Sequence, residues 1–430
     1  MKAPASKLQQ AQQQNRKSGM SPWKGIALCM VIVILPWALY VNFHPRGDVP
    51  HEGDIAHPAH SLGQMIDSMK APKVLDTVKL QAEQTAVVQV RPTNMLEFPD
   101  LPVLGPIPTN GAAPLFGVKH KGTDAIFALA CNYPTIYYKR FVGSLRKFGY
   151  TEDIVLAVSP VEKMKPGVEA YVKQTGVVAY GFDVDCKGTD NCKLKDEFLG
   201  YPDPRPYRTF ANIRYALYEY WMRHYSDNSY ILILDFRDTF FQANPFQQFG
   251  AFQQRTAPRY DLQMYAENYD VKNIGICVFN SNWIKTCFGK PALEALRKEA
   301  VICSGSTLGS FPAVKHYVRT MLSSMDTVKC WLKGIESDQG YQNYLFYNGH
   351  FNTKMGNATL FHQGTGVVNT IGAMNGFRVP KEKKGPLDTF WKIRDKEGYV
   401  LNYDGTRSAC VHQWDRWFDE LQKFIDANLF

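Results

Sequence analysis

Two aspartates that follow an apolar run are the residues of this chain best suited to chemistry. Residues 230–234 (YILIL) are wholly apolar and lead into Asp235-Phe-Arg237-Asp238. Two carboxylates and a guanidinium at the end of a buried strand are costly unless they have partners. A divalent cation and a diphosphate would satisfy both charge types, since Mg²⁺ and Mn²⁺ prefer oxygen ligands. The segment therefore indicates a metal and diphosphate site, with a structural Asp–Arg pair that caps the strand as the alternative.

Other polar side chains stand at positions where they could join this site. Arg208 and Arg214 lie near the start of the helix predicted before the Asp motif, where one of them could pair with a diphosphate. A solvated helix face is the alternative for both. Tyr133 and Tyr137 follow the first predicted strand and could stack on a nucleotide base, although plain packing explains them equally well.

Alternating strand and helix patterns from residue 123 onward predict an α/β fold. Apolar runs predict strands, and apolar residues at helical spacing predict the helices between them. The strands are expected at 125–131, 153–159, 177–183 and 230–234, and the helices at 141–148, 168–174, 208–225 and 417–429. This alternation implies a mostly parallel sheet with right-handed crossovers, in which ligands bind beyond the carboxyl ends of the strands. The Asp motif stands at such an end.

In this arrangement the sequence resembles the GT-A fold of nucleotide-diphospho-sugar glycosyltransferases over residues 123–430. Members carry an Asp-x-Asp signature after a buried strand, and Asp235-Phe-Arg-Asp238 is similar to it with one residue added. Three more segments resemble elements of glycogenin-like and plant-type retaining enzymes. They are Asn273-Ile-Gly275-Ile-Cys-Val-Phe-Asn280, similar to a strand that lines the donor sugar, Asp338-Gln339-Gly-Tyr-Gln-Asn343, and the late strand 408–416 (SACVHQWDR) with His412.

The resemblance implies a Rossmann-like, mixed and mostly parallel sheet flanked by helices. It also implies transfer of a hexose or pentose from a UDP- or GDP-sugar to a glycan or glycoprotein, with Mn²⁺ or Mg²⁺ as cofactor. The expected metal ligands are Asp235, Asp238 and His412. The residues expected to bind the donor are Tyr133, Arg208, Arg214, Asp235, Arg237, Asn273, Gly275 and Gln339. His362, which also follows an apolar run, competes with His412 for the ligand role.

Asp338 is the expected catalytic residue, near the anomeric centre. In an inverting enzyme it would deprotonate the acceptor hydroxyl. In a retaining enzyme it would stabilise an oxocarbenium-like transition state, and the nearest motif matches favour this case. Residues 302–309 (ICSGSTLG) are interpreted as a small-residue loop near the acceptor, because they lack the lysine and the spacing of a phosphate-binding P-loop. A catalytically inactive, membrane-anchored carbohydrate-binding or scaffold protein of the same fold is the alternative function, and a hydrolase is less well supported.

An uncharged run of 19 residues, 25–43, predicts a transmembrane helix, since a bilayer core is roughly 30 Å thick. A cleaved signal peptide is the alternative. The basic flank predicts a cytosolic N-terminus, and so a type II signal-anchor protein of the Golgi or ER membrane with a luminal catalytic domain. The expected parts are a cytosolic tail (1–24), the anchor (25–43), a proline-rich stem (44–122) and the catalytic domain (123–430), with a small folded subdomain as the alternative for the stem.

Charge and cysteine content are consistent with this picture. The chain has 49 Lys and Arg; six of them lie in residues 1–47, which hold no acidic residue, so the remainder carries 43 against 40 Asp and Glu. The basicity belongs to the tail, and no nucleic-acid footprint is expected. Outside the anchor, eight cysteines form an even set, as luminal disulfides require. Cys186 and Cys192 are the easiest pair, and reduced core cysteines are the alternative. The sequon at Asn357 predicts a glycosylated surface position.

Overall fold

The computed structural model describes residues 96–101, 111–116, 120–187, 191–200, 203, 205–247, 261–330, 338–374 and 394–430. The chain divides into a unit of residues 1–71 and a unit of residues 72–430, and every described residue belongs to the second unit. The predicted cytosolic tail, the predicted anchor and the first part of the predicted stem lie outside the described residues. Among the described helices, none combines the length and the apolar character that a bilayer crossing needs.

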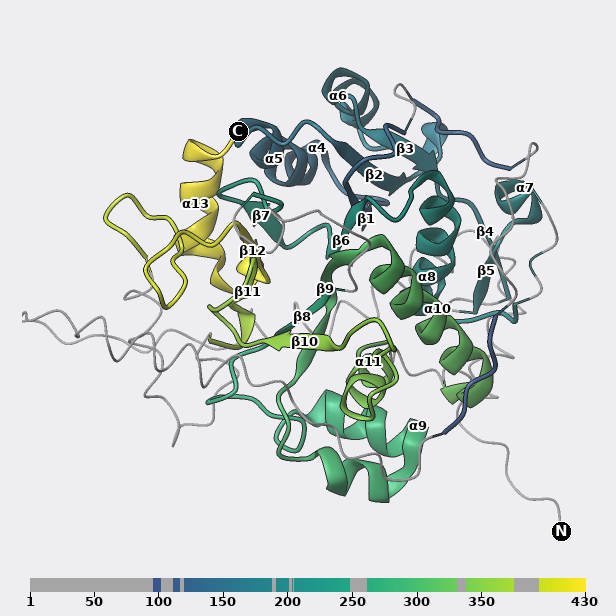
Figure 1. The fold of residues 1–430 in the computed structure, drawn as a ribbon. Helices are drawn as coiled ribbons and strands as arrows, with labels where there is room; N and C mark the ends of the chain where they lie inside the picture. The colour runs from purple at the N-terminus through teal and green to yellow at the C-terminus, as the bar shows by residue number, and fades with distance from the viewer. Residues whose placement is uncertain are drawn as a thin grey trace, which may run out of the picture. The chain divides into compact units, whose positions relative to one another are not determined.

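A seven-stranded sheet forms the centre of this unit, in the order β10-β8-β9-β6-β1-β2-β3 (Figure 1). Its strands are β1 (Ala125–Leu129), β2 (Asp153–Val158), β3 (Val178–Gly181), β6 (Tyr230–Asp235), β8 (Leu262–Ala266), β9 (Ile302–Ser310) and β10 (Ala358–Phe361). Strand β9 is antiparallel to β6 and to β8, whereas the other pairings within this sheet are parallel. The sheet is therefore mixed and mostly parallel, as expected.

Helices cover both faces of the sheet, so the strands are apolar on both sides. Successive side chains of a strand point to opposite faces: Ile231 and Ile233 join one core cluster, and Leu232 and Leu234 join the other. The first face is covered by α8 (Phe210–Trp221), α9 (Val278–Leu296), α10 (Phe311–Val328) and α11 (Asp338–Tyr347). The second face is covered by α4 (Thr135–Tyr138), the π-helical η1 (Lys139–Gly143), α5 (Ser144–Lys147) and α6 (Val168–Thr175).

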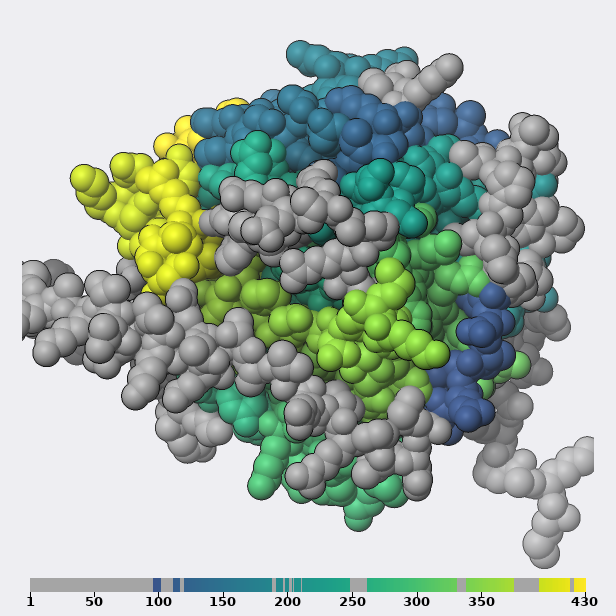
Figure 2. Space-filling model, viewed as in Figure 1, coloured from purple at the N-terminus to yellow at the C-terminus, as the bar shows by residue number. Residues whose placement is uncertain are grey.

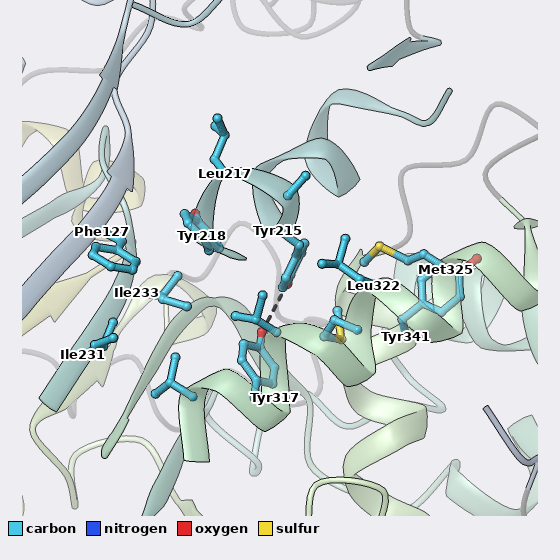
Figure 3. Packing of buried hydrophobic residues seen from close by; sticks show 14 of the residues in the cluster. Phe127, Tyr215, Leu217, Tyr218, Ile231, Ile233, Tyr317, Leu322, Met325 and Tyr341 are labelled. Atoms are coloured by element: carbon cyan, nitrogen blue, oxygen red, sulfur yellow. Dashed lines mark hydrogen bonds between the residues drawn. The ribbon is translucent and has the colours of Figure 1, made fainter. Parts of the chain in front are cut away.

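The core between the sheet and helices α8 and α10 is rich in tyrosine (Figure 3). Tyr215 of α8 and Tyr317 of α10 meet through their hydroxyl groups, with 3.1 Å between the oxygens. The Tyr317 hydroxyl also donates to Gln342 of α11 at 2.7 Å. Buried tyrosines need such partners for their hydroxyl groups, and these bonds join three helices to one another.

A small three-stranded sheet brings the C-terminal part of the chain to the end of β6. It has the order β11-β12-β7 and consists of β7 (Thr239–Phe241), β11 (Val368–Thr370) and β12 (Cys410–His412). Strand β7 starts one residue after Asp238, and in its antiparallel pairing with β12 it sets Thr239 opposite His412. This register places the last residue of β12 beside the Asp motif, although the two are far apart in the sequence.

The remaining elements complete the described fold. They are the β4–β5 hairpin (Val184–Cys186, Cys192–Leu194), α7 (Asp196–Leu199), α13 (Phe418–Asn428) and the 3₁₀ turns η2 (Val161–Lys163), η3 (Met222–His224), η6 (Gly372–Met374) and η9 (Trp414–Trp417). Described residues of the predicted stem pack on the domain. Phe116 is buried and bridges to Ala179, and Phe98 and Leu101 contact the core, so that residues 96–101 lie against the green surface at the right of Figure 2.

Two local predictions are wrong. Residues 302–309 form β9, a buried inner strand, and not a loop. Their small side chains allow close packing against neighbouring segments of the fold, and Gly309 lies so close to the Asp261 carbonyl that no Cβ would fit. Residues 273–281 do not form a strand: Asn273 makes an isolated bridge to Ala300, a turn follows, and α9 begins at Val278.

The prediction of an oxidised cysteine set is correct only in part. Disulfides join Cys186 to Cys192, as expected, and Cys287 to Cys330. The other four cysteines outside the predicted anchor are free thiols, namely Cys131, Cys277, Cys303 and Cys410. Three of these four are buried, as small apolar side chains often are. Asn357 of the sequon is exposed, just before β10.

Candidate active site

Asp235, Asp238 and His412 come together at the carboxyl end of β6. Asp235 is the last residue of β6, Asp238 lies in the turn before β7, and His412 ends β12. One ligand atom of each residue lies within 4.8 Å of the others. The His412 Nε2 atom is 3.7 Å from Asp235 Oδ2 and 3.5 Å from Asp238 Oδ1. Among the described residues, this is the only group of three or more acidic, histidine or cysteine side chains with this spacing.

Two arginines occupy the oxygens that face away from His412. Arg214 of α8 binds Asp235 Oδ1 at 2.6 Å, and Arg416 binds Asp238 Oδ2 at 2.6 Å. Each carboxylate therefore has one oxygen in an ion pair and its other oxygen directed toward His412. The three atoms without such a partner form an acidic site with one nitrogen, the ligand chemistry of a divalent cation such as Mn²⁺.

The electrostatics of the cluster favour the charged form of every member. Burial would lower the pKa of His412, but Cys303, Asp238 and Asp235 raise it well above its usual value. Burial would also raise the pKa of both carboxyl groups. Arg214 and His412 instead hold the pKa of Asp235 below its usual range, and His412 and Arg416 do the same for Asp238. The site thus stabilises positive charge between the carboxylates, whether a proton or a metal cation carries it.

The space around the triad also fits a metal ion. His412 is fully buried, yet its Nε2 atom has no hydrogen-bond partner, which is rare for a buried polar atom. Gly305 of β9 faces the cluster, and a Cβ atom there would stand 2.7 Å from Asp235 Cγ and 2.7 Å from His412 Cε1. The glycine therefore keeps a small volume free at the triad.

Asp338 and Gln339 begin α11 next to this cluster. Arg214 makes a second ion pair with Asp338 Oδ2 and donates to the Ser304 carbonyl at 3.2 Å. One guanidinium therefore joins the predicted catalytic carboxylate to Asp235, and this bridging role was not predicted from the sequence. Gln339 accepts a hydrogen bond from the Ser304 amide at 3.3 Å and donates to Asn280 Oδ1 at 3.3 Å. These contacts fix both polar side chains of the Asp-Gln pair.

A second group of charges borders the triad. Arg237 pairs with Asp415 Oδ2 at 2.7 Å, and Asp415 also pairs with Arg416. The side chain of Arg237 is 46% exposed, so it can reach a bound anion. Tyr133 lies near these residues, with its ring centroid 5.8 Å from that of Phe236. Burial raises the pKa of Tyr133; nearby Arg237 lowers it and Asp235 raises it further, so that the pKa is raised overall.

Other predicted site residues lie elsewhere or have local partners. Arg208 lies before α8 and pairs with Asp326 of α10 instead of facing the triad. Gly275 lies against Arg297, whose carbonyl would be 2.6 Å from an added Cβ, so local packing explains this glycine. Asn273 caps its own turn by accepting from the Ile276 amide at 3.0 Å. His362 is absent from the triad, where the structure places His412.

Sequence reasoning missed three residues of the site. Arg416, the last residue of the segment 408–416, holds Asp238, and no sequence pattern indicates this role. Gly305 and Ser304 went unrecognised because their segment was interpreted as a loop. The signal that was present is the run of small residues in 302–310, since small side chains and glycine let a strand pass close to other groups.

No family model and no curated protein matches this chain. Solved structures of glycosyltransferases are similar to it at low identity. Galactosyltransferase LgtC in complex with donor and acceptor sugar analogues has 12% identity and a TM-score of 0.38, over 70% of this chain and 95% of that chain. The bifunctional WbbM glycosyltransferase has 12% identity and a TM-score of 0.42, over 75% of this chain and 52% of that chain. GlyE of Streptococcus pneumoniae TIGR4 has 13% identity and a TM-score of 0.35, over 72% of this chain and 64% of that chain. Since these TM-scores are below 0.5, the assignment of function rests on the residues of this chain.

Proposed function

We propose that this chain is a metal-dependent glycosyltransferase that uses a nucleoside-diphosphate sugar. One observation carries the proposal: Asp235, Asp238 and His412 direct three ligand atoms to one point at the carboxyl end of β6. The carboxyl ends of strands are where open α/β sheets bind ligands. The arginines beside the triad supply positive charge for the diphosphate, which a carboxylate cluster alone would repel.

The triad would hold Mn²⁺ or Mg²⁺ through Asp235 Oδ2, Asp238 Oδ1 and His412 Nε2. A bound cation supplies Lewis-acid stabilisation of the negative charge on the nucleoside diphosphate as it leaves. Arg237, which is half-exposed, is positioned to bind a phosphate oxygen. Tyr133, half-buried beside Phe236, offers a ring face for the base of a UDP or GDP donor. Fixed charges of this kind lower the barrier because they need no rearrangement during the reaction.

Asp338 is the residue that we assign to the anomeric centre. Arg214 pairs with this carboxylate and fixes one of its oxygens, and the Gln339 backbone amide donates to the other at 2.8 Å. A carboxylate held in place in this way suits the stabilisation of an oxocarbenium-like transition state, so we favour a retaining reaction. Gln339 would orient the hexose or pentose, while Asn273 and Gly275 would contact the donor only through a change in their present local contacts.

The cellular setting is a further part of the proposal. The uncharged run at 25–43 and its basic flank support a type II anchor in the Golgi or ER membrane, with a glycan or glycoprotein acceptor in the lumen. The two disulfides and the exposed sequon are compatible with an oxidising compartment.

The proposal is tested by incubating the purified full-length chain with a panel of UDP- and GDP-sugars and Mn²⁺. We expect release of the nucleoside diphosphate with at least one donor, its loss in the presence of a chelator, and a decrease of at least about 10²-fold in Asp235→Asn. Asp326→Asn is the matched control, because it breaks an Arg–Asp pair of the same kind away from the triad. If no sugar is cleaved and none binds, the chain is not a glycosyltransferase; binding without cleavage would identify the inactive relative.

A further inference from the structure

The thiol of Cys303 lies behind the metal triad and has no role in the reaction above. Cys303 is the second residue of β9 and is 2% exposed. Its Sγ atom is 3.8 Å from His412 Nδ1, on the side of the ring opposite the Nε2 atom that faces Asp235 and Asp238. The thiol is the partner of Nδ1 in the structure, whereas Nε2 has none.

The identity of the Nδ1 partner determines which ring nitrogen is free to bind a cation. A neutral imidazole carries its proton on one nitrogen and a lone pair on the other. When Nδ1 carries the proton and donates it to a neighbouring acceptor, Nε2 keeps its lone pair for a metal ion. Histidine ligands in proteins usually rely on a carboxylate or a carbonyl for this purpose. Here a sulfur atom occupies that place.

The backbone after His412 supports the same sulfur atom. Gln413 has a positive φ of 59°, a conformation that residues other than glycine rarely adopt and that is found at functional sites. From this conformation its Nε2 group donates to Cys303 Sγ at 3.5 Å. Gln413 also fills the space beside Gly372, where no Cβ would fit. The strained residue thus fixes the acceptor that lies behind the metal-binding histidine.

We propose that Cys303 is a positioning residue for His412: its sulfur accepts the Nδ1 hydrogen, and Gln413 secures the sulfur, so that Nε2 is presented to the cation. The proposal rests on the metal site proposed above. Cys303 is not a member of the metal-binding group, which consists of Asp235, Asp238 and His412. The assignment gives one of the free buried cysteines a specific role and accounts for the unusual backbone of Gln413.

The test measures Mn²⁺ affinity of the full-length chain by calorimetry, without any nucleotide sugar. Partners of this kind typically contribute 10- to 100-fold to metal affinity. We therefore expect Cys303→Ala to weaken Mn²⁺ binding about 10-fold or more, and Cys303→Ser, which keeps an acceptor, to restore most of the loss. Cys277→Ala is the matched control, because it removes another buried thiol that accepts a hydrogen bond, from Asn280 at 3.1 Å. It should leave Mn²⁺ affinity unchanged.

A spectroscopic readout separates positioning from general destabilisation. Two-bond ¹H–¹⁵N correlations of His412, assigned by their loss in His412→Gln, should show the Nδ1–H tautomer in the Zn²⁺-loaded wild type and a weakened preference in Cys303→Ala. Gln413→Gly is a second variant, because it removes the amide that holds the sulfur and tolerates the positive φ; it should weaken Mn²⁺ binding while the chain stays folded. Equal affinities in Cys303→Ala and the wild type would overturn the inference alone, whereas a wild type that binds no Mn²⁺ would overturn the proposed function as well.

Discussion

Two histidines with little-exposed side chains have opposite environments in this molecule. His120 donates or accepts through both ring nitrogens: Nδ1 is 2.8 Å from the Tyr225 hydroxyl, and Nε2 is 2.7 Å from the Tyr180 hydroxyl. Its ring stacks on that of His224, with 3.8 Å between the centroids. Burial, and then His224, lowers the pKa of His120 to about 3. His412 instead lies between two carboxylates with Nε2 unpaired and with its pKa raised.

The difference distinguishes a structural histidine from one available for a ligand. The polar atoms of His120 are satisfied inside the fold, so the ring contributes to stability as a neutral group. The polar atoms of His412 are satisfied on one side only, and buried groups of this kind require a reason. The environment of His412 is costly unless a cation enters it, which is why the triad and not the His120 cluster carries the functional proposal.

The largest effect is expected for Asp338→Asn, which tests whether the carboxylate beside the triad is catalytic. The change keeps the shape of the side chain and removes the charge that pairs with Arg214. Turnover of the donor should decrease about 10²- to 10³-fold, as for other groups that stabilise transition-state charge, while Mn²⁺ affinity stays within a few-fold of the wild type. Steady-state kinetics and calorimetry check both parts. Asp326→Asn, in the Arg208 pair, should change neither, and equal turnover in the two variants would contradict the assignment.

Gly305→Ala tests the free volume at the triad. Its Cβ would press on Asp235 and His412, and overpacking of this kind typically costs about 1–3 kcal/mol. We expect weaker Mn²⁺ binding, by about 10-fold or more, together with a lower midpoint of thermal unfolding. Gly149→Ala is a useful comparison, because an added Cβ there meets no atom within 4 Å, although its positive φ of 75° adds backbone strain. A Gly305→Ala variant that binds Mn²⁺ like the wild type would show that the volume is not needed.

The smallest effect is expected for the pH dependence of folding stability that His120 causes. The folded-state pKa of His120, about 3, is below its ordinary value of 6.5, so protonation favours the unfolded chain. Its stabilising effect is complete above pH 6.5 and is lost as the pH falls toward 3. Between pH 6.5 and pH 5 the loss of unfolding free energy amounts to about 2 kcal/mol. Urea unfolding at the two pH values should show a weaker pH dependence in His120→Gln than in the wild type, and parallel profiles would contradict the assignment.

The sequence predicted the parts of the fold that have a strong apolar signal. Strands β1, β2 and β6 are wholly or almost wholly apolar, and each formed at its expected place. Strand β9 was missed because its cysteine, serine and glycine residues carry no such signal, although all nine positions are buried. Small residues suit this inner strand because one of its faces lies against the charged triad, where large apolar side chains would not fit.

The site was predictable to the extent that residue order along the chain reveals strand ends. Asp235 and Asp238 were recognised because an apolar strand leads into them, and His412 because it ends a late strand. The choice between the two arginines required the structure: Arg208 lies two positions before α8 begins and faces Asp326, whereas Arg214 lies in its second turn and reaches Asp235. Helical periodicity gives no information about a residue that precedes the helix.

The most direct test of the metal triad is a calorimetric titration of the full-length chain with Mn²⁺, in parallel with Asp238→Asn and His120→Gln. The account predicts one saturable site in the wild type, affinity reduced by at least about 10-fold in Asp238→Asn because a charged ligand is lost, and unchanged affinity in His120→Gln. A wild type without a saturable site, or an Asp238→Asn variant that binds Mn²⁺ as tightly as the wild type, would contradict it.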